Sequence, residues 1–223
     1  MYLRAEYRLG PELKFLGNLD TMHLMERALR RAGIPYALSE GFNPHIKLSM
    51  GTVLPVGLWS EKEYFDLEVM GQIEPGQFIN SLNQVLPPGL QLQQCIEIEA
   101  GTPSLMKTVN TACYVFAGWE ADEALLQEIW DSTTLPVPSR GKKKDVIKDL
   151  RPGLFRLELE KMERKILAWV SVGEPLNIRY DELLDLFAAR GLPPTSFKDI
   201  YRCGNYIKKA DCLHSPLEVI TKY

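Results

Sequence analysis

Residues 18–57 read NLDTMHLMERALRRAGIPYALSEGFNPHIKLSMGTVLPVG and predict a helix, a loop and a strand in succession. Asn18 is a good N-cap, and apolar residues recur at helical spacing up to Ala32. Gly33 and Pro35 then end the helical pattern. The apolar stripe of this helix must pack on another layer, and the flanking sequence predicts that this layer is a sheet.

Strands are predicted on both sides of this stretch, because short runs with alternating or β-branched apolar residues occur there. The elements expected up to residue 99 are strands at 2–9, 46–50, 64–69 and 90–99 and helices at 18–32 and 75–86. The order β-α-β-β-α-β is typical of the ferredoxin-like fold, an antiparallel sheet with both helices on one face.

The second half of the chain repeats this order. Strands are expected at 111–119, 154–160, 166–172 and 200–207, and helices at 121–130 and 180–190. We therefore predict an α+β protein of two tandem ferredoxin-like units, with domains at 1–100 and 105–223. The Gly101-Thr102-Pro103 sequence between them is a typical chain breaker.

The composition is that of a globular protein, with 223 residues, 45% of them hydrophobic and 25% charged. No apolar run approaches the roughly 20 residues that span a bilayer, and the start of the chain lacks a secretory leader pattern. We therefore expect a cytoplasmic protein that does not enter a membrane.

The four cysteines are scattered, which suits neither a disulfide framework nor paired metal knuckles. Cys203, Cys212 and His214 could in principle ligate a metal, but the spacing of the two cysteines is wider than in a knuckle. We expect reduced thiols, no metal and no cofactor. Phosphate-binding loops, dinucleotide fingerprints, hydrolase elbows and iron–sulfur motifs are absent from the sequence.

Charge is spread unevenly along the chain, although the net charge is only −3. Residues 1–60 carry a net +2, residues 61–135 a net −10 and residues 136–223 a net +5. Basic ends around an acidic middle permit a local site for a polyanion, and surface solubility explains such a split equally well.

The predicted helix carries Arg27, Arg30 and Arg31 on the sides that its apolar stripe leaves free. The planar guanidinium binds phosphate or carboxylate in a bidentate fashion, which favours an anion site. The alternative is a solvated face whose cations offset the helix dipole near its C-terminus.

The loop that follows, Ser-Glu-Gly-Phe-Asn-Pro-His-Ile-Lys at 39–47, brings an aromatic ring, an imidazole and an ammonium group into one turn. A nucleobase could stack on Phe42 while Lys47 holds a phosphate, as in many single-strand binding proteins. The alternative is that Phe42 fills the core and Asn43 caps the loop.

A second basic loop occupies the corresponding place in the second half of the chain. It contains Lys142, Lys143 and Lys144 and is followed by Lys148 and Arg151. Such a run either contacts a polyanion or is merely solvated.

Several motifs resemble those of the radical-SAM-linked family, a domain of unknown function. They are Phe15-Leu16-Gly17-Asn18-Leu19-Asp20, Glu26-Arg27-Ala28-Leu29-Arg30-Arg31-Ala32-Gly33, Ser39-Glu40-Gly41-Phe42-Asn43-Pro44-His45, Leu54-Pro55-Val56-Gly57 and, more weakly, Lys148-Asp149-Leu150-Arg151. The resemblance implies that the chain works with a radical-SAM protein in trans, and no catalytic residue is established for the family. Gly17-Asn18 stands where the family usually has Ser-His, which removes a histidine, and Ile46 replaces a frequent proline.

Three functional hypotheses remain open. The first is a noncatalytic accessory module that binds ribosomal or transfer RNA and works with a radical-SAM enzyme. The second is a metal-independent endoribonuclease in which His45 is the candidate catalytic residue. The third is a protein–protein adaptor without RNA contact. The candidate binding residues are Arg27, Arg30, Arg31, Glu40, Phe42, Asn43, His45, Lys47, Lys142, Lys143, Lys144, Lys148 and Arg151.

Overall fold

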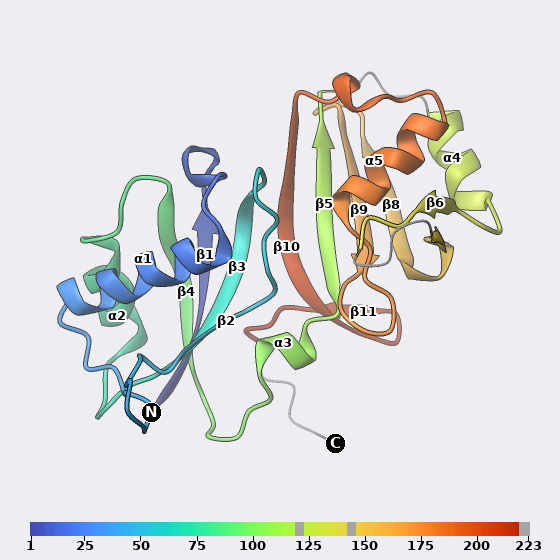
Figure 1. Cartoon of the computed structure of the whole chain (residues 1–223). Helices are drawn as coiled ribbons and strands as arrows, with labels where there is room; N and C mark the ends of the chain where they lie inside the picture. The colour runs from blue at the N-terminus through green and yellow to red at the C-terminus, as the bar shows by residue number, and fades with distance from the viewer. Residues whose placement is uncertain (119–122, 142–145, 219–223) are drawn as a thin grey trace. The chain divides into compact units, whose positions relative to one another are not determined.

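The computed structural model describes residues 1–118, 123–141 and 146–218 and shows a mixed α+β protein with five α-helices in these ranges. The chain divides into two compact units. The first unit comprises Met1–Val109 and Gly204–Tyr223, and the second comprises Asn110–Cys203. Figure 1 shows their elements. The domain bounds expected from the sequence, 1–100 and 105–223, stay a prediction.

The first unit contains a sheet in which the strands follow the order β4-β1-β3, with β2 also paired to β3. Its elements are β1 (Tyr2–Leu9), α1 (Asn18–Arg31), β2 (Leu48–Met50), β3 (Trp59–Glu68), α2 (Pro75–Asn83), β4 (Leu90–Ile98), α3 (Leu105–Thr108) and β11 (Cys212–His214). All of these pairings between β1, β2, β3 and β4 are antiparallel.

Helices α1 and α2 pack on the apolar face of this sheet. Alternate residues of β1, from Leu3 to Leu9, share one buried cluster with Met25 and Leu29 of α1 and Phe78 of α2. The alternation predicted for the first strand is therefore the pattern that builds the core.

Strand β3 begins at Trp59, five residues before the strand expected at 64–69. The prediction missed this part because it contains polar residues, among them Ser60 and Glu63, which are nevertheless buried. The Glu63 carboxylate accepts a hydrogen bond from Asn205 Nδ2 at 3.2 Å. Asn205, more than 140 positions away, thus supplies a hydrogen bond that allows Glu63 to be buried at the start of β3.

The second unit has the strand order β10-β5-β9-β8. Its elements are β5 (Thr111–Ala117), α4 (Glu123–Asp131), β6 (Pro136–Pro138), β7 (Ile147–Asp149), β8 (Leu154–Glu160), β9 (Lys165–Ser171), α5 (Tyr180–Ala189) and β10 (Asp199–Lys209), whose later residues belong to the first unit. Phe116 of β5 packs on Phe187 of α5 with ring centroids 5.0 Å apart.

The short hairpin β6–β7 was missed by the sequence analysis, which expected only a loop here. Prolines at both ends of β6 argue against a strand by propensity, but a two-stranded sheet tolerates them at an edge. The hairpin brings the start and the end of the second basic loop together, because Ser139 N donates to Val146 O at 2.8 Å.

The opposite face of the first sheet carries a buried ion pair. Arg4 of β1 is 3% exposed, and its guanidinium binds both carboxylate oxygens of Asp66 on β3, at 2.7 and 2.9 Å. The same guanidinium donates to the carbonyl oxygens of Pro103 and Pro216, each at 3.1 Å. One side chain therefore joins two strands to two distant loops.

None of the helices in residues 1–118, 123–141 and 146–218 combines the length and the apolar composition of a membrane span.

The Arg4–Asp66 pair predicts a large effect of a small substitution. Asp66→Asn leaves a buried guanidinium without its counter-charge, so we expect a loss of about 3 kcal/mol in the free energy of unfolding, measured with urea. Glu68→Gln, two residues along the same strand, breaks the more exposed Lys47–Glu68 pair and is expected to cost less than about 1 kcal/mol. Equal losses in the two variants would contradict this role of Arg4.

Candidate binding site

The loop at 39–45 in the first unit is closed at its base by three hydrogen bonds. Ser39 N donates to His45 O at 2.8 Å, and His45 N donates to Ser39 Oγ at 3.1 Å. The Ser39 hydroxyl also lies 2.8 Å from His45 Nδ1. Below the loop, Leu38 and Ile46 form an antiparallel bridge, and Ile46 is buried. The base of the loop is therefore fixed, and residues 40–44 form its tip.

Phe42 stands at this tip with a relative exposure of 106%. The alternative that Phe42 fills the core is therefore wrong. Gly41 has a φ of 124°, which side-chain-bearing residues rarely adopt, and this allows the sharp turn. The loop is closed by Ser39, and within the described residues the Asn43 side chain makes no hydrogen bond. The alternative in which Asn43 caps the loop is therefore wrong as well.

Lys47 and Glu68 form an ion pair beside the loop, with Nζ and Oε2 2.9 Å apart. The hydrogen bond that the Lys47 ammonium group donates to the Glu68 carboxylate raises the pKa of Lys47 above its usual value. The two residues line a depression of about 260 Å³ together with Tyr2, His45, Ser49 and Asp66, among others. In this arrangement a carboxylate already neutralises the ammonium group that the sequence assigned to a phosphate.

The three arginines of α1 differ in their surroundings. Arg31 donates to the carbonyl oxygen of Val85 at 2.8 Å, which fixes its guanidinium against the chain after α2. Arg27 and Arg30 are exposed, and neither forms an ion pair or a side-chain hydrogen bond with the described part of the chain. Two of the three predicted cations are therefore available for an anionic ligand.

In the second unit, Lys148 binds a carboxylate that is completely buried. Its Nζ lies 2.7 Å from Oε2 of Glu182, which is 0% exposed, and it also donates to the carbonyl oxygen of Asn177. Glu182 accepts further bonds from the backbone N–H groups of Arg140 and Arg179, both at 3.0 Å. Lys148 is therefore a counter-ion that attaches the β6–β7 hairpin to α5. Lys142, Lys143 and Lys144 lie outside the described residues.

Arg151 stacks on Trp130 of α4, with its guanidinium carbon 4.5 Å from the ring centroid. It also donates to Leu154 O at 3.3 Å. Both contacts hold the start of β8 in place, so Arg151 has a structural role whether or not it binds a ligand.

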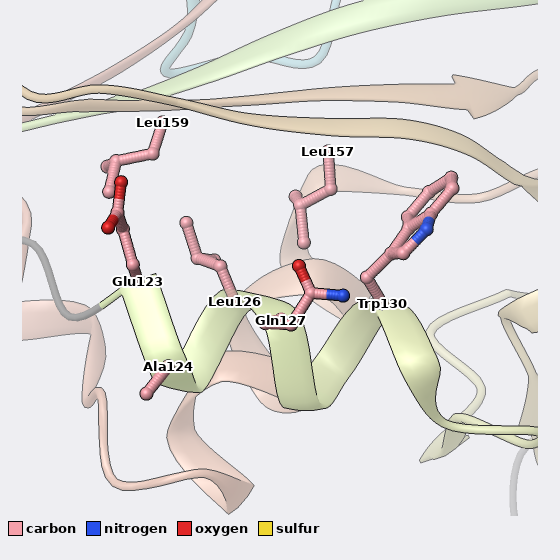
Figure 2. A pocket seen from close by; sticks show the side chains of 7 residues that line it. All are labelled: Glu123, Ala124, Leu126, Gln127, Trp130, Leu157 and Leu159. Carbon is pink, nitrogen blue, oxygen red and sulfur yellow. The ribbon is translucent and has the colours of Figure 1, made fainter.

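The same tryptophan lines a groove of about 530 Å³ between α4 and β8, which the sequence analysis did not predict. Figure 2 shows Leu157 extending from the strand toward the helix between Leu126 and Trp130, and Leu159 lying beside Glu123. The sequence signal for this groove was the spacing of four residues between Leu126 and Trp130 and of two residues between Leu157 and Leu159.

Thiols and metal ligands offer no alternative centre in the described ranges. No group of three or more His, Cys, Asp and Glu side chains there could hold a metal ion. His214 pairs with Glu218, with Nδ1 and Oε2 2.9 Å apart. Burial raises the pKa of Cys95 to about 12, which makes it a poor nucleophile at neutral pH.

The fold and the loop define an α+β protein that presents an exposed aromatic side chain on a fixed turn. Residues 2–180 match the family described as an uncharacterized protein conserved in bacteria (DUF2344), and the chain belongs to this family. No curated protein matches the chain. The matched range includes both the loop at 39–45 and the Lys148–Arg151 motif, and the link to a radical-SAM protein stays a prediction.

The stability of a Lys148 variant tests whether Lys148 has the structural role of a counter-ion to Glu182. Lys148→Ala leaves the buried Glu182 carboxylate uncompensated, and we expect a loss of about 3 kcal/mol in the free energy of unfolding. Arg140→Ala is the matched control, because Arg140 pairs with Asp185 on the same helix at an exposed position and its removal is expected to cost under about 1 kcal/mol. Urea unfolding monitored by tryptophan fluorescence measures both. A Lys148→Ala variant as stable as the control would contradict the structural role.

Proposed function

We propose that the chain is a noncatalytic accessory module that binds RNA and works with a radical-SAM enzyme in trans. The observation that carries the RNA contact is the complete exposure of Phe42 at the tip of a loop with a fixed base. An aromatic ring exposed to water at the tip of a loop whose base is fixed is a ready platform for an unstacked base.

Arg27 and Arg30 supply the phosphate contacts in this proposal, because both are exposed and neither has a carboxylate partner in the described part of the chain. Lys47 joins them only if its bond to Glu68 opens, since the two groups are paired at 2.9 Å. Glu40, Asn43 and His45 belong to the same loop and are the proposed polar contacts to the base. The site thus concentrates on the first unit.

We also propose that each unit is ferredoxin-like. The antiparallel order β4-β1-β3-β2 in the first unit and the order β10-β5-β9-β8 in the second support this proposal. In the second unit, the register places Leu157 and Phe116 on the same face of the sheet, where α4 and α5 pack. The cytoplasmic location is part of the same proposal.

The radical-SAM partner rests on the resemblance of the motifs in residues 15–57. Affinity purification of the tagged chain from its native cells, with and without nuclease, tests this part. Recovery of a radical-SAM protein in both samples supports the partnership. Its recovery without any RNA in the untreated sample would instead support the adaptor hypothesis.

The observation that favours an endoribonuclease as the second candidate is the contact of His45 Nδ1 with Ser39, which leaves Nε2 available for proton transfer. Tyr2 and Glu68 line the same depression and are candidates for a second proton-transfer group. If this candidate is correct, the purified chain cleaves RNA, His45→Ala abolishes cleavage and His23→Ala does not. No cleavage by the unmodified chain would exclude it.

Phe42 gives the main test of RNA binding. We expect Phe42→Ala to weaken binding of a fluorescent single-stranded RNA by about 5- to 150-fold, because loss of one base–aromatic stack costs about 1–3 kcal/mol. Phe42→Trp keeps a ring and should bind within about threefold of the unmodified chain. Anisotropy titrations at one fixed salt concentration measure these affinities.

An Arg27→Ala, Arg30→Ala double variant provides the second arm of this test. Its affinity should fall most at low salt, and its salt dependence should be shallower than that of the unmodified chain. Phe42→Ala, in contrast, should leave the salt dependence unchanged. Equal RNA binding by all variants would overturn the proposed site.

A further inference from the structure

Besides Phe42, the first unit exposes a group of apolar side chains near the start of α1. None of them belongs to the loop at 39–45. Phe15, Leu19 and Val56 have relative exposures of 74%, 64% and 57%. Single exposed apolar residues are ordinary, but a group of large ones on neighbouring segments marks a contact surface. We call these three side chains the apolar patch.

The backbone beneath the apolar patch is fixed. Gly57 N donates to Lys14 O at 2.7 Å, which joins the segment of Val56 to that of Phe15. Asp20 accepts a hydrogen bond from Gly17 N at 3.1 Å and so fixes the start of α1 next to Leu19. The patch is therefore held in one shape before anything binds to it, which lowers the entropic cost of association.

The neighbours of these residues explain why the patch side chains face outward. Leu13 and Leu54, each two positions from a patch residue, pack against the core of the first unit. Leu13 and Leu54 anchor the segments of Phe15 and Val56 and supply the apolar groups that these segments contribute to the core. Exposure of Phe15 and Val56 is therefore not required by the packing of the unit.

One uncompensated cation accompanies the patch. The ammonium group of Lys14 lies 5.4 Å from the centroid of the Phe15 ring. It has no carboxylate partner in the described part of the chain. A cation beside exposed apolar side chains fits a partner that offers a carboxylate next to its own apolar groups, because the ion pair would form where water is excluded.

We propose that the apolar patch docks a protein segment that presents apolar side chains and a carboxylate facing Lys14. The inference rests on the part of the proposed function that gives the chain a protein partner, and it is independent of RNA binding. Two of the three patch side chains are aliphatic and a single cation lies beside them, which suits a protein better than a nucleic acid, whose phosphates require several cations. The Phe42 loop and the patch are thus assigned to different ligands.

The test begins with p-benzoylphenylalanine incorporated in place of Leu19 in the full chain, expressed in its native cells. Irradiation should give one dominant protein adduct, and mass spectrometry should locate the crosslink in a segment with apolar residues and an Asp or Glu. The same photoreactive residue in place of Met106, which is also exposed in the first unit, is the control and should not give this adduct.

Binding is then measured with the partner identified by the crosslink. Phe15→Ala should weaken it at least tenfold, and Lys14→Glu should weaken it by a similar factor. A partner in which lysine replaces the carboxylate residue should bind the Lys14→Glu variant tightly and the unmodified chain weakly. This exchange of charges distinguishes direct contact from a change in folding, since a misfolded Lys14→Glu variant could not be rescued.

The other outcomes would overturn the inference. They are an adduct with a second copy of the chain, an adduct with RNA alone, equal adducts from positions 19 and 106, or a charge exchange without rescue. RNA binding is measured on the same variants and should be unchanged in Phe15→Ala. If the unmodified chain binds no RNA but position 19 still gives the protein adduct, the proposed RNA contact is refuted and the proposed docking surface is not.

Discussion

The buried guanidinium of Arg4 is the constraint on which the first unit depends. It binds Asp66 on the neighbouring strand and the carbonyl oxygens of Pro103 and Pro216, so its desolvation is offset only when all three segments are in place. Pro216 is 212 positions away from Arg4. The first unit is therefore not complete at residue 109, because the chain must return from the second unit to cover this face of the sheet.

This long-range closure explains which parts of the fold the sequence predicts. Helix α1 and strand β1 were found because their apolar periodicity lies within a few residues and needs no knowledge of the partner. The beginning of β3 was missed because the burial of Glu63 depends on Asn205. The β6–β7 hairpin was missed for a related reason, since prolines oppose a strand locally and the Lys148–Glu182 contact that supports the hairpin joins residues far apart in the chain.

The same distinction applies to the candidate site. Gly41 and the Asn-Pro pair at 43–44 identified the loop, because turn chemistry is local. The sequence could not tell which cations are free, because that depends on partners in other elements. Arg31 and Lys47 are held by Val85 and Glu68, whereas Arg27 and Arg30 are not held. The position of Phe42 in water also depends on Ile46, and not Phe42, filling the core beneath the loop.

Residues 14–57 contain one helix and the residues of both proposed contacts. The buried face of α1, with Met25 and Leu29, fixes the helix on the sheet, so the segments before and after it are held without using their own exposed side chains. The segment before α1 carries the apolar patch residue Phe15, and the segment after it carries Phe42. Other residues fill the core, so neither aromatic side chain is needed there, and contact with a ligand, as we propose, would remove their exposed apolar surface from water. The backbone beneath Phe15 is fixed by the hydrogen bond from Gly57 N to Lys14 O, and the loop of Phe42 is fixed by the bridge between Leu38 and Ile46, so the two rings belong to separately fixed segments and we assign them to two separate contacts.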